Sequence, residues 1–242
     1  MASKLSDDTL STIFLKLPVK SLLRCRCVCK SWRKLLCDPH FVKMHLNHIS
    51  QHHRKLLLGN SDCFCSLDYE TSHRNAVPQG FPLEITPCTK IWGSCNGLVC
   101  VALLPETKAG EYEKLVKVAL WNPSTADYKM LPSADPSVND CQIVGFGYDS
   151  SIDDYKMVRI IPGYFVKAEN EPCRVDCEQR VDMYSLKTNS WKIIRDLPRR
   201  DVFRHAPLIF NHEFAGGVSI NESIYWVLGS KIIGFDLKNE KF

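Results

Sequence analysis

The chain has 242 residues, 45% of them hydrophobic and 24% charged, and a net charge of +4, which is typical of a soluble globular protein with one sizeable domain and a small module. No uncharged apolar run approaches the roughly 18 residues of a membrane span, which excludes a protein with membrane-crossing helices. Asp7 and Asp8 stand where a secretory signal would need an apolar region, so we expect no membrane partner and a location in the cytoplasm, the nucleus or both.

The first predicted helix begins after Ser6, which is a good N-cap residue followed by two acids in the first turn. Four apolar residues then recur at helical spacing and form one stripe: Leu10, Ile13, Phe14 and Leu17. Pro18 forces its neighbour towards extended geometry and ends this helix.

Three further short helices are predicted before residue 47. The second runs through Ser21–Leu23, the third holds Trp32, Leu35 and Leu36, and the fourth begins at Asp38-Pro39, a capping residue followed by proline at the first helical position. A segment of about 40 residues rarely builds a core of its own, so such a density of apolar residues suggests that a partner completes it. The alternative to partner binding is a helical cap that packs on the chain's own downstream domain.

The stretch LPVKSLLRCRCVCKSWRKLLCDPHFVKMHL, at 17–46, resembles the F-box of plant F-box proteins. The resemblance implies that this module binds a Skp-type adaptor and, through it, the cullin of a ubiquitin ligase. It also implies six residues at the adaptor interface or in its immediate support: Leu5, Ile13, Leu17, Pro18, Leu22 and Trp32. Two positions depart from the family pattern, because Ser6 replaces a usual proline and Cys25 replaces a larger aromatic residue.

After His53 the pattern becomes strand-like, with short runs of β-favouring residues separated by turn residues. We predict strands within 56–58, 63–67, 98–104, 115–121, 143–148, 157–161, 181–186, 191–194, 218–220, 224–228 and 232–237.

A repeated spacing of two aromatic residues, seven positions apart around a polar turn, runs through this half. The four pairs are Trp121 with Tyr128, Tyr148 with Tyr155, Tyr184 with Trp191, and Phe235 with Phe242. A β-hairpin explains the spacing, since the second strand brings its ring back opposite or diagonal to the first. We expect these rings to belong to the hydrophobic core.

Four phrases in this half resemble the F-box-associated, kelch-like β domain of the same plant family: GSCNGLVCV at 93–101, LWNPSTADYKMLP at 120–132, GFGYDSSIDDYKMVRI at 145–160 and MYSLKTNSWKIIRDLP at 183–198. The expected fold class is α+β, with an all-α F-box at 1–46, a linker at 47–54 and an all-β, propeller-like domain at 55–242. In the family this domain recognises the protein substrate. We expect loops 104–113 and 163–180 to present the contacts, while the substrate-binding residues stay unknown.

The last predicted hairpin ends at Phe242, where the family's members usually run further. We therefore expect a C-terminally truncated chain with an incomplete β domain and an exposed strand edge.

The charge is uneven along the chain. Residues 1–60 contain 11 Lys and Arg against three acids, whereas the rest contains 20 basic and 24 acidic residues. A basic N-terminal module suits an acidic partner, because opposite potentials accelerate and orient encounter. Nucleic acid would fit the charge too, but the basic residues surround an apolar surface without an evident base-reading helix, so we predict no nucleic-acid partner.

The cysteines and histidines give no clear metal site. Without an export signal, the twelve cysteines are best interpreted as reduced thiols. Cys63-x-Cys65 and Cys173-x3-Cys177 do not form the paired frame of a structural zinc site. The histidines of the last helix (His45, His48, His52 and His53) are interpreted as a polar end of that helix, where the chain leaves it. We predict no metal and no cofactor.

Catalytic motifs are equally weak. Ser94-Cys95-Asn96-Gly97 lacks the surroundings of a nucleophile elbow, and Gly145-Phe146-Gly147 lacks the third glycine of a dinucleotide loop. The leading hypothesis is a non-catalytic substrate receptor of an SCF ubiquitin ligase. The alternatives are an adaptor-binding protein that delivers no substrate and, more remotely, a basic nucleic-acid binder.

Overall fold

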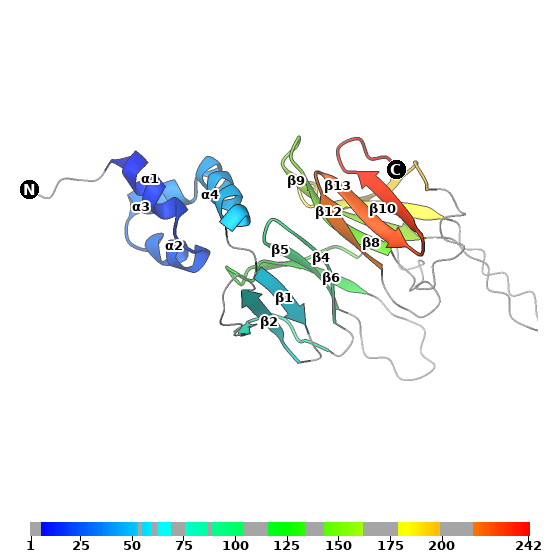
Figure 1. The fold of residues 1–242 in the computed structure, drawn as a ribbon, viewed down its shortest axis with the longest axis horizontal. Coiled ribbons are helices and arrows are strands. Elements are labelled where there is room, and N and C mark those ends of the chain that lie inside the picture. The colour runs from blue at the N-terminus through cyan, green and yellow to red at the C-terminus, as the bar shows by residue number, and fades with distance from the viewer. Residues whose placement is uncertain are drawn as a thin grey trace, which may run out of the picture. The chain divides into compact units, whose positions relative to one another are not determined.

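The computed structural model describes residues 6–52, 55–59, 62–68, 76–86, 89–103, 116–133, 143–161, 179–198 and 215–242. By its contacts the chain divides into two compact units. The first comprises Met1–Glu84 with Asn122–Asp127, and the second comprises Ile85–Trp121 with Tyr128–Phe242. Figure 1 shows helices at the N-terminal end and strands in the rest, which confirms the α+β class.

The first unit begins with four helices: α1 (Asp7–Leu15), α2 (Val19–Cys25), α3 (Lys30–Leu36) and α4 (Pro39–His52). Ser6 caps α1 as predicted, because its side chain accepts a hydrogen bond from the Thr9 backbone N–H. Asp38 caps α4 in the same way by accepting from His40 and Phe41 at 3.0 and 3.2 Å. Both helix starts thus follow from local capping chemistry.

The fourth helix is longer than predicted. We expected the helical module to end at residue 46 and a linker to follow at 47–54, but α4 continues to His52. The physical reason is that Phe41, His45, His48 and Ile49 share one buried or half-buried helix face, and no Pro or Gly interrupts it. The first compact unit continues beyond α4 to Glu84. Within the described residues, none of the helices is long and apolar enough to cross a membrane.

The same unit contains a three-stranded antiparallel sheet in the order β1 (Lys55–Gly59), β2 (Phe64–Asp68) and β3 (Val77–Gln79). Phe64, on the central strand, is buried and meets Phe81 edge-on at 5.1 Å. Sequence analysis predicted β1 and β2 and missed β3, which has three residues and contains Pro78.

The second unit contains two larger sheets. One has the order β4 (Lys90–Cys95), β5 (Leu98–Leu103), β6 (Lys117–Trp121) and β7 (Tyr128–Met130). The other combines β8 (Ile143–Asp149), β9 (Asp154–Ile161), β10 (Arg180–Ser185) and β11 (Ser190–Ile194) with β12 (Ala215–Ile220), β13 (Ser223–Leu228) and β14 (Lys231–Asp236). Its order is β11-β10-β9-β8-β12-β13-β14, with β8 and β12 parallel. Sequence analysis missed β4 and β7.

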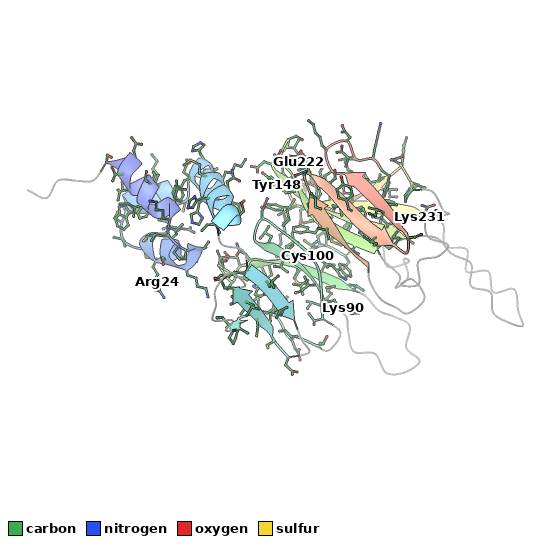
Figure 2. The ribbon with its side chains drawn as sticks, viewed as in Figure 1. Arg24, Lys90, Cys100, Tyr148, Glu222 and Lys231 are labelled. Carbon is green, nitrogen blue, oxygen red and sulfur yellow. The ribbon has the colours of Figure 1, made fainter. Side chains whose placement is uncertain are left out.

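The strands β8 and β12 are neighbours in one sheet, and β4 of the other sheet lies against both of them. Glycines permit the approach of β8 and β12 to β13: a Cβ atom on Gly217 would lie 2.5 Å from Nε1 of the Trp226 ring. A hydrogen bond from the Ser150 hydroxyl to the Glu222 carboxylate joins the turn after β8 to the turn after β12, so these two turns lie at the same end. Figure 2 shows Tyr148 and Glu222 close together at that end.

The predicted aromatic hairpins are confirmed by the register. Trp121 pairs with Tyr128, Tyr148 with Tyr155, and Tyr184 with Trp191 as directly opposite residues. The fourth pair brings Phe235 and Phe242 to 5.0 Å between ring centroids, beside a bridge between Asp236 and Lys241. Burial is more varied than expected: Trp121, Tyr184 and Phe235 are fully buried, most of the others are half-buried, and Tyr128 is exposed.

A buried lysine joins the second hairpin to the last turn. Lys156 Nζ donates to the Asp149 carboxylate at 2.8 Å, to the Leu237 carbonyl at 2.7 Å and to Glu240 at 3.3 Å. Lys192, which is exposed, reaches the same Glu240 from β11. Burial by itself would raise the pKa of Asp149, but hydrogen bonds from Lys156 and Ser151 outweigh it and hold the pKa below its ordinary value.

Candidate functional site

The structure distributes the six predicted interface residues between surface and interior. Ile13 and Pro18 are exposed, Leu17 and Trp32 are half-buried, and Leu22 is buried. Leu5 lies outside the described residues. Leu22 therefore supports the surface from within, whereas Ile13 and Pro18 are placed to touch a partner. The interface role of all six remains a prediction.

A small core holds the four helices together. It consists of four buried side chains, one from each helix: Phe14, Leu22, Leu36 and Phe41. Leu17, Cys25 and Trp32 pack against it, and Trp32 meets Phe14 edge-on at 5.0 Å. Cys25 is only partly buried there, so the small thiol fills a position at the margin of the core. The core of the helices is thus small: four side chains are buried, and the residues packed against them are only partly buried.

Further apolar side chains stand on the outside of these helices, where they would be costly in a self-contained module. Ile13 is 45% exposed and Val28 65% exposed, and Val42 and Met44 on α4 are exposed as well. No pattern in the sequence marks Val28, Val42 or Met44 as interface residues, because helical periodicity does not distinguish a face that packs on its own core from one that binds a partner.

The corner between α1 and α2 is shaped by backbone chemistry. α1 ends at Leu15, and the Leu17 N–H still donates to the Phe14 carbonyl at 3.1 Å. Pro18 is the N-cap of α2, with φ −60° and ψ 149°, and its carbonyl accepts from Ser21 and Leu22. Leu17 and Pro18 are thereby held in a rigid turn that projects between two helices.

One histidine contradicts the interpretation made from sequence. We expected His45 to form part of a polar end of the last helix, but its side chain is 7% exposed. Its Nε2 lies 2.9 Å from the Leu17 carbonyl oxygen, and its ring stacks on Phe41 at 6.1 Å. Among the described residues, no group of three or more His, Cys, Asp and Glu side chains is placed to hold a metal ion.

Basic side chains surround the apolar surface. Exposed lysines and arginines come from all of the first three helices or their ends: Lys16, Lys20, Arg24, Lys30, Arg33 and Lys34. Figure 2 shows Arg24 projecting from α2. An apolar centre inside a positive rim is complementary to an acidic partner with an apolar groove.

Comparison with known proteins adds the family. The F-box associated beta propeller domain model matches residues 64–242, and the F-box domain model matches residues 2–44. The chain belongs to the plant F-box proteins.

Relatives of this F-box protein come from Arabidopsis thaliana. It is 31% identical to F-box protein CPR1 across 97% of its own length and 58% of that protein's length. It is 27% identical to F-box/kelch-repeat protein At3g23880, covering 63% of that protein. It is 28% identical to F-box/WD-40 repeat-containing protein 1, covering 49% of it. The chain thus spans about half to three fifths of the length of these relatives.

A second surface lies on the outward face of β12–β14 in the propeller domain. Five apolar side chains are exposed on these strands: Val218, Ile220, Tyr225, Val227 and Ile232. Val227 is directly opposite Ile232, and Val218 is directly opposite Tyr225, so they form one continuous face. The loops predicted to present contacts, 104–113 and 163–180, lie outside the described residues except for 179–180.

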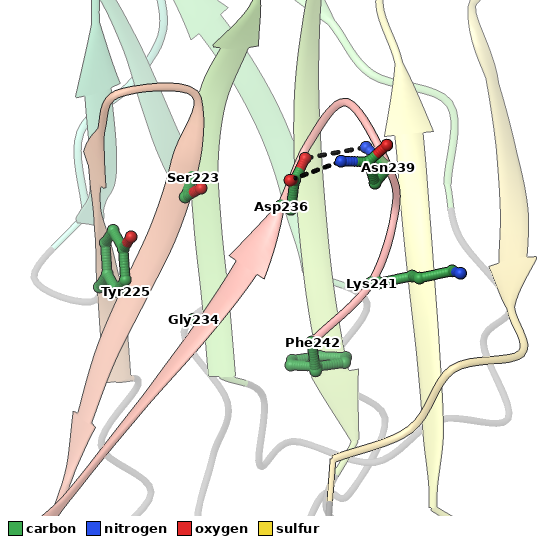
Figure 3. Close-up of a pocket in the computed structure, with 7 residues that line it drawn as sticks. All are labelled: Ser223, Tyr225, Gly234, Asp236, Asn239, Lys241 and Phe242. Carbon is green, nitrogen blue, oxygen red and sulfur yellow. Dashed lines mark hydrogen bonds between the residues drawn. The ribbon is translucent and has the colours of Figure 1, made fainter.

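A cavity of about 590 Å³ opens on this face. Figure 3 shows Tyr225 beside Gly234 on one side and Asp236 hydrogen-bonded to Asn239 on the other. Its remaining lining residues are Ser223, Lys241 and Phe242. The residues form neither a nucleophile–base pair nor a set of metal ligands, so the cavity offers binding chemistry but no evident reaction.

Proposed function

We propose that this F-box protein is a non-catalytic substrate receptor of an SCF-type ubiquitin ligase. Its helices bind a Skp-type adaptor and, through it, the cullin. The second compact unit, which we call the β unit, binds a target protein for ubiquitination and degradation. The receptor contributes rate by raising the target's effective concentration at the ubiquitin-loading site. It acts in the cytoplasm, the nucleus or both.

One observation carries the adaptor part of the proposal. The four-helix module buries one large side chain from each helix yet leaves Ile13, Val28 and the Leu17–Pro18 corner in contact with solvent. Basic residues lie on the same helices and their ends, and only Leu17 and Pro18 belong to the turn between α1 and α2. This arrangement supports a docking surface for an acidic adaptor better than it supports an isolated module.

The first experiment measures binding of the full chain to a purified Skp-type adaptor. The double variant Leu17→Asp, Pro18→Ala should lower affinity at least about 30-fold, because it places a charge in a desolvated contact and loosens the turn. Asn47→Asp, which adds the same carboxylate on the exposed side of α4, is the matched control. Wild-type affinity of the double variant would refute the docking surface.

The second experiment concerns the target. The expected targets are proteins whose level rises when the chain is removed. Their level should fall again when the wild-type chain is restored, but not when the Leu17→Asp, Pro18→Ala variant is supplied. Accumulation of none would favour the alternative of an adaptor-binding protein that delivers no substrate. Steeply salt-dependent binding to duplex DNA near micromolar affinity would instead favour a basic nucleic-acid binder.

A further inference from the structure

We propose that His45 is the residue that positions the adaptor-docking corner, by hydrogen-bonding the peptide between Leu17 and Pro18 to the middle of α4. The proposal rests on the proposed function and concerns the same surface. His45 makes no docking contact in this account, because its side chain is buried.

The hydrogen bond joins two parts of the module that are 28 residues apart in sequence. Its acceptor, the Leu17 carbonyl, lies just beyond the end of α1 and directly before Pro18, the N-cap of α2. The backbone hydrogen bonds of the described turns and caps supply no donor to this oxygen, whereas the Pro18 carbonyl receives two. His45 Nε2 therefore meets an acceptor that the helix ends leave open.

The ring has little freedom to move away. It stacks on Phe41, one turn earlier in α4, with an interplanar angle of 22°. Phe41 is itself one of the four buried core side chains. Because Phe41 fixes the plane of the imidazole, the N–H at Nε2 is directed at the Leu17 carbonyl, and Nε2 is assigned as the donor since a carbonyl can only accept.

The hydrogen bond from His45 affects the orientation of Leu17 and Pro18, the two corner residues of the proposed docking surface. The Leu17 side chain packs on the core and Pro18 is exposed, so the angle of the peptide between them sets where both point. A surface held in its bound geometry before binding loses less conformational entropy on association. Loss of the hydrogen bond should therefore lower affinity without changing any side chain that touches the adaptor.

The experiment compares adaptor affinity for His45→Leu, His45→Gln and the wild-type full chain. Leu preserves apolar packing but cannot donate, and it should weaken binding about tenfold. Gln keeps an N–H donor at a similar reach and should restore most of the affinity. His40→Leu, which removes an exposed histidine of the same helix, should stay within about twofold of wild type.

A second variant and a second measurement distinguish a positioning role of His45 from a purely structural one. Leu36→Val thins the same core but leaves the His45 hydrogen bond in place, so it should lower the melting temperature and leave affinity near wild type. Nitrogen-15 spectra of the wild-type imidazole should show a protonated Nε2, and this result does not depend on any variant folding.

Three results would overturn the proposal: wild-type affinity of His45→Leu, no rescue by His45→Gln at equal helix content, or an unprotonated Nε2. Failure of the wild-type chain to bind the adaptor would overturn the proposed function and this inference together. Normal wild-type binding with an unaffected His45→Leu variant would overturn this inference alone.

Discussion

The helical module and the β unit solve the problem of burial in different ways. The helices share a core of four side chains and leave exposed apolar residues among lysines and arginines. The β unit buries whole aromatic rings such as Trp121 and Trp226, and it buries a lysine only with acceptors around it. The helical module therefore has the smaller core of the two, and we expect it to gain more stability from a bound partner than the β unit does.

The sharpest way to break this comparison is to remove the buried lysine. Lys156→Met should destabilise the β unit by about 3 kcal/mol, because it leaves the Asp149 carboxylate buried without its cation. Urea unfolding followed by tryptophan fluorescence measures the loss. Lys192→Met removes an exposed partner of Glu240 and should cost at most about 1 kcal/mol. Equal effects of the two substitutions would show that burial does not set the strength of this network.

The acid response of the same network follows from the direction of the Asp149 pKa. The folded-state pKa lies below the ordinary value of 3.8, so the carboxylate stabilises the fold above that value, and this stabilisation is lost as the pH falls through the folded pKa. In Lys156→Met, burial remains while the main hydrogen bond is gone, so the pKa should rise. Urea midpoints measured from neutral to acid pH should therefore fall less steeply below 3.8 in the variant.

A smaller effect is expected where β8 passes under β13. A Cβ atom on Gly145 would collide with the Ile224 side chain and lie 2.7 Å from the Trp226 ring. Gly145→Ala should cost about 2 kcal/mol through overpacking. Gly80, with nothing within 4 Å of such an atom, gives the matched alanine control. A neutral Gly145→Ala substitution would mean that β8 and β13 are not tightly packed at this crossing.

The smallest expected effect lies in the helical module, at the residue that departs from the family pattern. Ser6 and Pro18 have nearly the same N-cap geometry, with φ −66° and −60°. Ser6→Ala should cost about 1 kcal/mol and speed hydrogen exchange of α1 amides about fivefold. Ser6→Pro loses the cap but restricts the unfolded chain, so it should lie closer to wild type. An Ser6→Pro variant worse than Ser6→Ala would contradict this account of the departure.

The features that could be predicted from the sequence are those that local chemistry determines. The four helices followed from Ser6, Asp38 and the apolar stripe of α1, and the hairpins followed from pairs such as Tyr184 and Trp191. Each of these features depends on residues within about one or two turns of each other.

Contacts between distant segments could not be read from sequence. The parallel pairing of β8 with β12 joins residues such as Ile143 and Ala215, and no pattern at either strand specifies the other. β4 was missed because Gly93 interrupts its β-favouring run next to a register shift. His45 was misread because its partner is a backbone carbonyl 28 residues away, which leaves no trace in side-chain spacing.

Hydrogen exchange of the full chain, with and without a purified Skp-type adaptor, tests the central claim most directly. The account predicts that amides of α1–α3 exchange faster than those of β8–β10 in the absence of adaptor, because their core is thinner. Adding the adaptor should slow exchange in α1–α3, most strongly around Leu17, and leave β8–β10 unchanged. Equal protection of both regions before binding, or slowing confined to the β unit after it, would contradict the account.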